Sequence, residues 1–474
     1  MIRFHNTLSG REEEFLPLVP GEVRIYTCGP TVYNVPHIGN FRAYVFEDLL
    51  LRFLRFSGYK TIQVMNLTDV DDKTIRDARA AGLSLRDYTA PFIESFFAGL
   101  QTLRIHPADH YPRATEHIPD MVRIIKGLLD KGVAYRKEGS IYFDISKFPS
   151  YGRLSGIDVE ALRTTSRIGA RLETDEYEKE SARDFALWKA PKEGEPFWET
   201  EIGPGRPGWH IECSAMSAAF LGPTFDIHCG GVDNIFPHHE NEIAQSEAYF
   251  EKPFVRYWLH CHHLIVDGEK MSKSKGNVYS LDDLVETRRV DPSVLRMFLL
   301  STHYRKVLNF TFEALDQAAA ALKRITDFVY ELEHRAFPDA GSGLAGPLIA
   351  EADAEFRDGL GDDLNVSSAL TALYDLIRKA NSLIREEKIG ADEARALRSF
   401  VSQVDDVLAV LPERREEEVS AAVREKIEAR ELARKAKNWA EADRLRRELL
   451  EAGIVLEDTK DGIRWKIAPR KESS

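Results

Sequence analysis

Residues 21–65 read GEVRIYTCGPTVYNVPHIGNFRAYVFEDLLLRFLRFSGYKTIQVM, and this stretch predicts the class of fold. Apolar and polar residues alternate from 21 to 28, as in a half-buried strand, before Gly29-Pro30 ends the pattern. Apolar side chains then recur at helical spacing over residues 41–56, and residues 59–65 again resemble a strand. A strand, a glycine-containing turn, a helix and a second strand form a βαβ unit, which predicts a parallel α/β sheet.

The pattern of apolar and polar residues changes twice along the rest of the chain. Residues 107–200 mix short strand-like segments with many charges, which indicates a domain inserted between two halves of the sheet, and strand character returns at residues 225–229 and 259–266. From residue 312 onward amphipathic helical patterns follow one another at residues 314–335, 347–360, 366–387 and 391–411. A helix-rich piece then leads into a predicted hairpin at residues 454–466.

A chain of 474 residues is too long for one hydrophobic core, and these patterns predict three domains. We expect a Rossmann-like parallel-sheet domain over residues 1–310, with its insertion at about 107–200. An all-α helical bundle over residues 311–411 and a small C-terminal domain over 412–474 complete the prediction.

Composition excludes several classes of protein. The chain is 43% hydrophobic and 30% charged, with no secretory leader pattern and no apolar run long enough to cross a bilayer, so we expect a cytoplasmic protein. Its net charge of −13 argues against indiscriminate coating of nucleic acid but allows a local basic face. The four cysteines are widely and irregularly spaced, which favours free thiols or metal ligands over disulfides. No sustained apolar seam is visible, so we expect a monomer.

The turn Pro36-His37-Ile38-Gly39-Asn40 joins the first predicted strand to its helix. Ligands bind at the carboxyl ends of parallel strands, and a helix N-terminus favours phosphate. Gly39 would let a nucleotide approach the backbone, and His37 would donate to a phosphate oxygen as charge develops. Taken alone, a turn histidine is at least as often structural.

A second short motif, Lys270-Met271-Ser272-Lys273-Ser274, lies on a loop that Gly276 bounds. Lysines interleaved with small hydroxyl residues suit a pyrophosphate leaving group. A solvated basic loop is the plain alternative for this motif by itself. A histidine–glycine turn followed by this loop, in that order, resembles the paired signatures of class I aminoacyl-tRNA synthetases.

A metal site is the third candidate. His238 and Glu242 are four residues apart and would share one helix face, within reach of a single ion. Cys28 ends the first strand and Cys213 lies in another segment, so two cysteines, a histidine and a carboxylate form a plausible zinc set. Spacing alone leaves the alternative of four unrelated residues open.

Longer motifs identify a specific resemblance. They are Cys28-Gly-Pro-Thr-Val-Tyr33 and the segments 66–73, 184–189, 205–216, 230–242, 362–365, 439–443 and 453–459. These motifs resemble the cysteinyl-tRNA synthetase family, and the similarity runs from about Tyr26 to Trp465. The resemblance implies that the bundle and the C-terminal domain bind the anticodon stem and loop of tRNA(Cys), with Trp439 and Trp465 as stacking surfaces, although both tryptophans would also suit a core.

The resemblance also implies roles for individual residues. It implies zinc ligands at Cys28, Cys213, His238 and Glu242. It implies contacts to ATP, which binds with a magnesium ion, from His37, Asn40, Lys270 and Lys273, with the adenosine received at Gly230, Gly231 and Asp233. It implies a cysteine pocket walled by Trp209, His210 and His228. The family signature usually ends in histidine where this chain has Asn40, which donates a hydrogen bond but carries no charge.

The implied function is a cysteine–tRNA ligase, which forms cysteinyl-adenylate from cysteine and ATP and then acylates tRNA(Cys). One zinc ion per chain would recognise the substrate thiolate. The three alternatives are a ligase that acylates an amino sugar with the same adenylate, a catalytically inactive RNA-binding paralogue, and a nucleotidylyltransferase of related fold.

Overall fold

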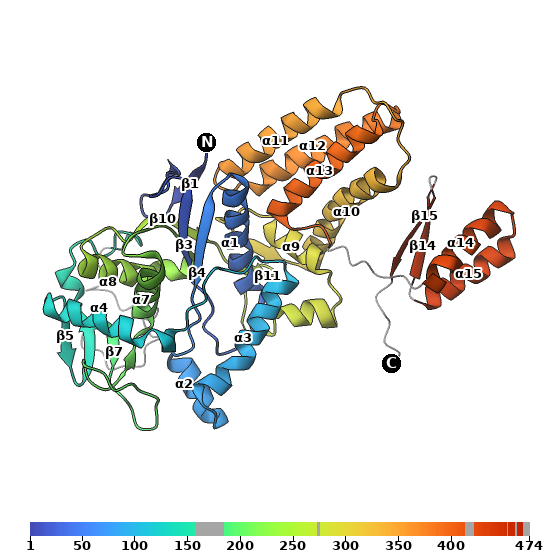
Figure 1. Cartoon of the computed structure of the whole chain (residues 1–474). Coiled ribbons are helices and arrows are strands. Elements are labelled where there is room, and N and C mark those ends of the chain that lie inside the picture. The colour runs from blue at the N-terminus through green and yellow to red at the C-terminus, as the bar shows by residue number, and fades with distance from the viewer. Residues whose placement is uncertain (158–183, 273–274, 413–420, 453, 460–461, 468–474) are drawn as a thin grey trace.

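The computed structural model describes residues 1–157, 184–272, 275–412, 421–452, 454–459 and 462–467. Its central sheet has four parallel strands in the order β10-β9-β3-β4 (Figure 1). These strands are β3 (Glu22–Thr27), β4 (Lys60–Met65), β9 (Phe225–Gly231) and β10 (Val255–Cys261). Thr27 pairs with both Met65 and Cys229, so the carboxyl ends of the strands meet at one edge. The βαβ unit predicted from residues 21–65 is confirmed.

Helices cover both faces of this sheet. On one face lies α1 (Ile38–Phe56), and on the other lie α4 (Ile118–Asp130), α7 (Trp209–Leu221) and α8 (Glu240–Phe250) (Figure 1). Parallel strands need such crossovers, and a sheet covered on both sides is apolar along most of its length. Accordingly, Ile25, Ile227 and Leu259 are fully buried. Each face has its own hydrophobic core.

An antiparallel sheet forms the inserted part. Its strands are β5 (Ala134–Lys137), β6 (Ser140–Phe143), β7 (Phe185–Lys189) and β8 (Arg206–Pro207), in that order. The helices α2 (Asp72–Ala81) and α3 (Leu85–Thr102) precede it. Lys189 Nζ lies 2.7 Å from Asp72 Oδ2, and Arg206 also pairs with Asp72, so buried cations of the insertion contact the first turn of α2.

Short elements surround the main sheet. They are the hairpin β1 (Arg3–Asn6) and β2 (Arg11–Glu14), the small sheet of β11 (Leu264–Val266), β12 (Glu269–Lys270) and β13 (Leu308–Phe310), and helix α9 (Pro292–Leu300). The strand character expected over 259–266 is confirmed, and it is divided between two strands in different sheets. The chain leaves the central sheet after Cys261, and β11 then pairs with β13 instead of continuing beside β9.

Four helices form the predicted bundle: α10 (Phe312–His334), α11 (Ala345–Gly361), α12 (Val366–Arg385) and α13 (Ala391–Leu408). The bundle packs against the part of the chain that contains the central sheet, with α13 in contact with α1 and α10 in contact with α9 (Figure 1). A buried ion pair stands at this junction, because Arg296 Nη2 lies 2.5 Å from Asp48 Oδ2 while Arg296 Nε donates to the Leu408 carbonyl at 2.8 Å.

The C-terminal part contains α14 (Ala421–Lys435), α15 (Trp439–Glu451) and the antiparallel hairpin of β14 (Ile454–Thr459) and β15 (Gly462–Ile467). The predicted hairpin is confirmed. Leu449 and Leu456 form a small core with Val423 and Ile427. The Trp439 side chain is 59% exposed rather than part of that core, and the Trp465 side chain lies outside what the structure describes. Among the described residues, no helix has the length and apolar character needed to cross a membrane.

Candidate active site

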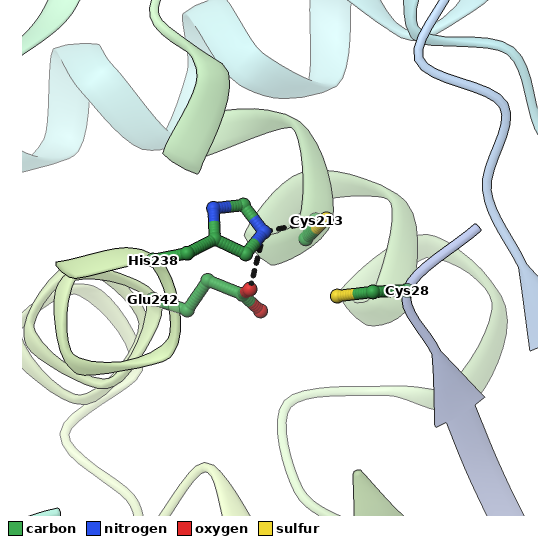
Figure 2. Close-up of side chains that lie close together, drawn as sticks. All are labelled: Cys28, Cys213, His238 and Glu242. Carbon is green, nitrogen blue, oxygen red and sulfur yellow. Dashed lines mark hydrogen bonds and ion pairs between the residues drawn. The ribbon is translucent and has the colours of Figure 1, made fainter. Parts of the chain in front are cut away.

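Four side chains from three separate segments converge beside the carboxyl end of β3 (Figure 2). Cys28 directly follows β3, Cys213 lies on α7, His238 belongs to the kinked segment Ile235–His239 before α8, and Glu242 lies in the first turn of α8. Their donor atoms all lie within 4.8 Å of one another. The last three side chains are buried, Cys28 is partly buried, and none of the four cysteines of the chain forms a disulfide.

The distances within this cluster suit a tetrahedral metal ion. Cys213 Sγ lies 3.5 Å from His238 Nε2, and a zinc ion with bonds of about 2.3 Å to sulfur and about 2.0 Å to nitrogen would separate the two donors by roughly that distance. His238 Nε2 lies 3.0 Å from Glu242 Oε1. Although His238 is this close, Glu242 Oε1 has no hydrogen bond of acceptable geometry among the described residues. A buried carboxylate oxygen left without a hydrogen bond fits a metal ligand.

Neighbouring histidines hold two of the donors in place. His228 Nε2 lies 2.9 Å from Glu242 Oε2 and would donate to it, which leaves Oε1 facing the cluster. His238 Nδ1 lies 2.9 Å from His210 Nδ1. If His238 Nε2 binds a metal, its Nδ1–H would donate to His210, and such outer hydrogen bonds fix the tautomer of a ligating histidine.

The charges of the cluster favour a cation. Burial opposes ionisation of Glu242, but the charges and hydrogen bonds of His228 and His238 outweigh it and lower the pKa of Glu242 to about 2. A hydrogen bond from Cys28 lowers the pKa of the Cys213 thiol to about 6, against the effect of burial. Burial opposes protonation of His238, but Glu242 and Cys213 raise the pKa of its imidazole to about 10, so these two acidic groups favour a positive charge beside them. Thiolate with imidazole and carboxylate is a donor set that suits zinc.

A second donor set overlaps the first one and was missed by the sequence analysis. Cys28, His228, His239 and Glu242 also bring their donor atoms within 4.8 Å of one another. His239 Nε2 lies 3.2 Å from Cys28 Sγ, and its Nδ1 lies 2.8 Å from His260 Nε2. The only sequence signal for His239 was its position next to His238.

The residues expected to wall a cysteine pocket lie against this cluster. The Trp209 ring stacks on the His238 ring, with centroids 4.0 Å apart and an interplanar angle of 18°. His210 and His228 contact His238 and Glu242 as described above. His228 is fully buried, so its position suits orienting the Glu242 carboxylate rather than lining open space.

The two short motifs meet at the N-terminus of α1. His37 is the N-cap residue of α1, and the backbone N–H of Ile38 donates to the Tyr279 carbonyl at 3.0 Å. A Cβ atom placed on Gly39 would lie only 2.4 Å from Met271 Cε, so the side chain of the loop residue Met271 packs directly against the first turn of α1. Lys270 is exposed on β12, whereas Lys273 lies outside the described residues.

Asn40, which departs from the family signature, has a structural role here. Its Oδ1 accepts a hydrogen bond from the His37 backbone N–H at 3.0 Å, within a capping box that satisfies the first turn of α1. The side-chain oxygen of Asn40 is therefore occupied by the helix cap.

The residues expected to receive adenosine end β9. A Cβ atom on Gly230 would lie 2.8 Å from Cε1 of the buried His239 ring, so Gly230 has no room for a side chain, whereas Gly231 is close only to the end of the exposed Asp233 side chain. Asp233 is exposed, and its Oδ1 lies 3.6 Å from His263 Nδ1. Each of these residues, like Cys28, follows or ends a strand at the carboxyl edge of the sheet.

Comparison with families of known proteins gives matches over most of the chain. Residues 14–320 match the family described as tRNA synthetases class I (C) catalytic domain. Residues 355–412 match the DALR domain, and residues 416–465 match the Cysteinyl-tRNA ligase anticodon binding domain.

Individual relatives align along nearly their whole length. A cysteine–tRNA ligase of Chlamydia muridarum is 50% identical over 481 residues, and the alignment covers 98% of each chain. One from Leptospira interrogans is 47% identical over 471 residues, covering 98% of this chain and 99% of the relative. A solved Mycobacterium tuberculosis methionyl-tRNA synthetase in complex with methionyl-adenylate has a TM-score of 0.58 at 17% identity, covering 82% of this chain and 90% of that one. This structural likeness concerns the fold alone.

Proposed function

The chain belongs to the cysteine–tRNA ligase family of class I aminoacyl-tRNA synthetases and is a cysteine–tRNA ligase, and from that premise we propose that a bound zinc ion selects its amino acid. The proposed ligands are Cys28, Cys213, His238 and Glu242. The observation that carries the proposal is the convergence of these four donor atoms within 4.8 Å, beside an aromatic wall at Trp209.

The need for a metal follows from the substrate. Cysteine differs from serine by a single atom, and an apolar pocket separates such near-isosteres by only about 1–3 kcal/mol. When bound, zinc supplies a coordination position that prefers thiolate sulfur over a hydroxyl oxygen. The neighbouring side chains of the protein position the proposed metal ligands. His228 orients Glu242, His210 fixes the tautomer of His238, and Trp209 closes the side of the pocket.

Activation of the amino acid requires charge stabilisation rather than a protein nucleophile. The substrate carboxylate attacks the α-phosphorus of ATP in line, and pyrophosphate leaves. We propose that His37, Lys270 and Lys273, with the magnesium ion of the nucleotide, stabilise the negative charge that develops. Gly39 and Asn40 would let the phosphates approach the N-terminus of α1. Gly230, Gly231 and Asp233 would receive the adenosine, with the Asp233 carboxylate accepting from ribose hydroxyls.

Transfer completes the reaction. The terminal ribose hydroxyl of tRNA(Cys) attacks the carbonyl of the adenylate, and AMP leaves. The match of residues 416–465 to an anticodon-binding domain supports tRNA as the acceptor and argues against the amino-sugar ligase. We expect the enzyme to act as a cytoplasmic monomer.

The test is ATP–pyrophosphate exchange on protein of known metal content. We expect one zinc per chain and exchange that depends on cysteine and not on serine. Cys213→Ser should lose both zinc and exchange, whereas the control Cys261→Ser, at a buried thiol outside the cluster, should keep both. Normal selection of cysteine by zinc-free protein would refute the proposed role of the metal.

A further inference from the structure

The loop after β12, which carries Met271 and which we call the lysine loop, is fixed on its N-terminal side by a small sheet. Lys270 belongs to β12, which pairs with β11, and β11 pairs in turn with β13. Asn277 closes the base of the loop, because its Oδ1 accepts from the Ser272 backbone N–H at 2.8 Å and its Nδ2 donates to the Lys270 carbonyl at 3.3 Å. Hydrogen bonds therefore define this side of the loop.

The C-terminal side of the lysine loop lies against the start of α1. Ser280 forms an antiparallel bridge with His37, and the Tyr279 carbonyl accepts from the Ile38 backbone N–H at 3.0 Å. The Ser280 hydroxyl oxygen in turn accepts from the Asp283 backbone N–H at 3.0 Å. His37 is the residue proposed to stabilise charge on the phosphates. A shift of Tyr279 would therefore change the position of the loop relative to His37.

The side chain of Arg288 lies between two aromatic rings at this point. Its guanidinium carbon is 5.0 Å from the centroid of the Tyr279 ring and 5.1 Å from the centroid of the Phe312 ring. A guanidinium within about 6 Å of a ring centroid is attracted to the ring face. Arg288 Nε also lies 3.2 Å from Asp283 Oδ2, and this ion pair sets the direction of the guanidinium.

The two rings belong to different parts of the chain. Tyr279 follows the lysine loop, whereas Phe312 is the first residue of α10 and so begins the helical bundle. Their centroids are 6.1 Å apart, and both rings also contact the buried ring of Phe310, at 5.3 Å from Tyr279 and 5.5 Å from Phe312. Arg288 thus joins the loop to the bundle at the end of β13.

A solvated surface arginine is the plain alternative, because the Arg288 side chain is 42% exposed. Contact with both rings at once favours a positioning role. Phe312 is itself 44% exposed, and Tyr279 is only half-buried, so burial in a core does not fix these rings by itself. The guanidinium supplies attraction to both of them at an exposed place.

We propose that Arg288 is a positioning residue for the use of ATP. By joining the Tyr279 ring to the Phe312 ring, it holds the C-terminal side of the lysine loop against His37. Arg288 touches no substrate and acts through Tyr279. The inference rests on the proposed function, because the contact between the lysine loop and ATP is part of that function. Cysteine is proposed to bind at the cluster around Cys213, so its affinity should not depend on Arg288.

The test measures ATP and cysteine separately on the full chain. In pyrophosphate exchange, Arg288→Ala should raise KM for ATP about 10-fold, the factor that two exposed cation–π contacts represent together, and should leave KM for cysteine unchanged. Arg288→Lys, which keeps a cation for the rings, should restore most of the ATP affinity. Phe312→Leu removes one ring face and keeps an apolar side chain, so it should also raise KM for ATP. Because the two residues act through one contact, the double variant Arg288→Ala/Phe312→Leu should lose less than the product of the two single effects.

The matched control is Arg357→Ala. The Arg357 guanidinium carbon lies 3.9 Å from the centroid of the Phe56 ring, its Nε lies 2.9 Å from Asp353 Oδ2, and its side chain is 43% exposed. This arginine on α11 therefore makes the same kinds of contact away from the lysine loop. Arg357→Ala and Arg288→Ala should have similar effects on the melting temperature, but Arg357→Ala should leave KM for ATP as in the wild type.

Equilibrium dialysis with ATP, which needs no turnover, separates this inference from the proposed function. Arg288→Ala should bind ATP about 10-fold less tightly than the wild type. Absence of exchange from a wild type that binds ATP would count against the proposed function alone. Equal ATP affinity of Arg288→Ala and the wild type, an equal rise of KM for ATP and for cysteine, or an Arg288→Lys variant as impaired as Arg288→Ala would overturn the proposal.

Discussion

Replacing Asp48 by asparagine should destabilise the junction between the catalytic part and the bundle by about 3–5 kcal/mol, the usual cost of breaking a buried ion pair. The Asp48 side chain is fully buried and that of Arg296 is 1% exposed, with 2.5 Å between Asp48 Oδ2 and Arg296 Nη2. Asp48 Oδ1 also accepts from the His106 backbone at 2.8 Å. Burial lowers the pKa of Arg296, but this guanidinium remains charged and would lose its only buried counter-charge among the described residues.

The assay is thermal unfolding, followed at the first transition. At about 2–4 °C per kcal/mol for a cooperative unit of some 200 residues, a loss of 4 kcal/mol corresponds to roughly 8–16 °C. The matched control is Asp375→Asn, because Asp375 pairs with Arg378 at 3.1 Å with both side chains largely exposed, and such pairs contribute at most about 1 kcal/mol. The double variant Asp48→Leu/Arg296→Met should recover much of the stability lost in Asp48→Asn. A shift for Asp48→Asn no larger than that of the control would refute the reasoning.

Two further predictions concern a buried acid and an exposed indole. Among the described residues, neither carboxylate oxygen of Glu47 has a hydrogen-bond partner, and burial raises the pKa of Glu47 well above its usual range. The folded state therefore keeps a proton that the unfolded state releases above about pH 4.5, so wild-type stability falls by about 1.4 kcal/mol per pH unit from there until the folded pKa is reached. In urea unfolding, the free energy of unfolding of Glu47→Gln should rise relative to that of the wild type between pH 5 and 7, but not at pH 4. A difference that does not depend on pH would contradict this prediction. Trp439, 59% exposed at the start of α15, should stack on an RNA base, so Trp439→Leu should raise KM for tRNA about 10-fold with pyrophosphate exchange intact, and an unchanged KM would count against it.

Local patterns predicted most of the architecture. The βαβ unit of residues 21–65 and the bundle helices from residue 312 were visible because strands and helices impose their periods on neighbouring residues. The C-terminal hairpin was found for the same reason. Strand character over 259–266 was visible too, but its division between two sheets was not, since the departure of the chain after Cys261 depends on pairing with β13, which begins only at Leu308.

The convergence of the candidate metal ligands could be predicted only in part from the sequence. His238 and Glu242 could be paired from their spacing, but their approach to Cys213 and Cys28 depends on packing of α7 and β3 against α8. His239 was missed because adjacent residues on a regular helix point about 100° apart, so only His238 was expected to face the metal. In the structure Phe236 has an extended backbone at the kink before α8, and the His238 and His239 rings reach Cys213 and Cys28 respectively. No periodic pattern in the sequence indicates such a kink.

The tertiary structure also decided features whose partners are remote in sequence. Asp48 and Arg296 are 248 residues apart, and Lys189 of the insertion pairs with Asp72 of α2 across 117 residues. The spacing of apolar side chains follows the period of the helix or strand to which they belong and the face that it buries. The sequence by itself therefore determined which elements form and in which order. Long-range pairing depends instead on how those elements pack, because a donor and an acceptor meet only once the packed core brings their backbones together.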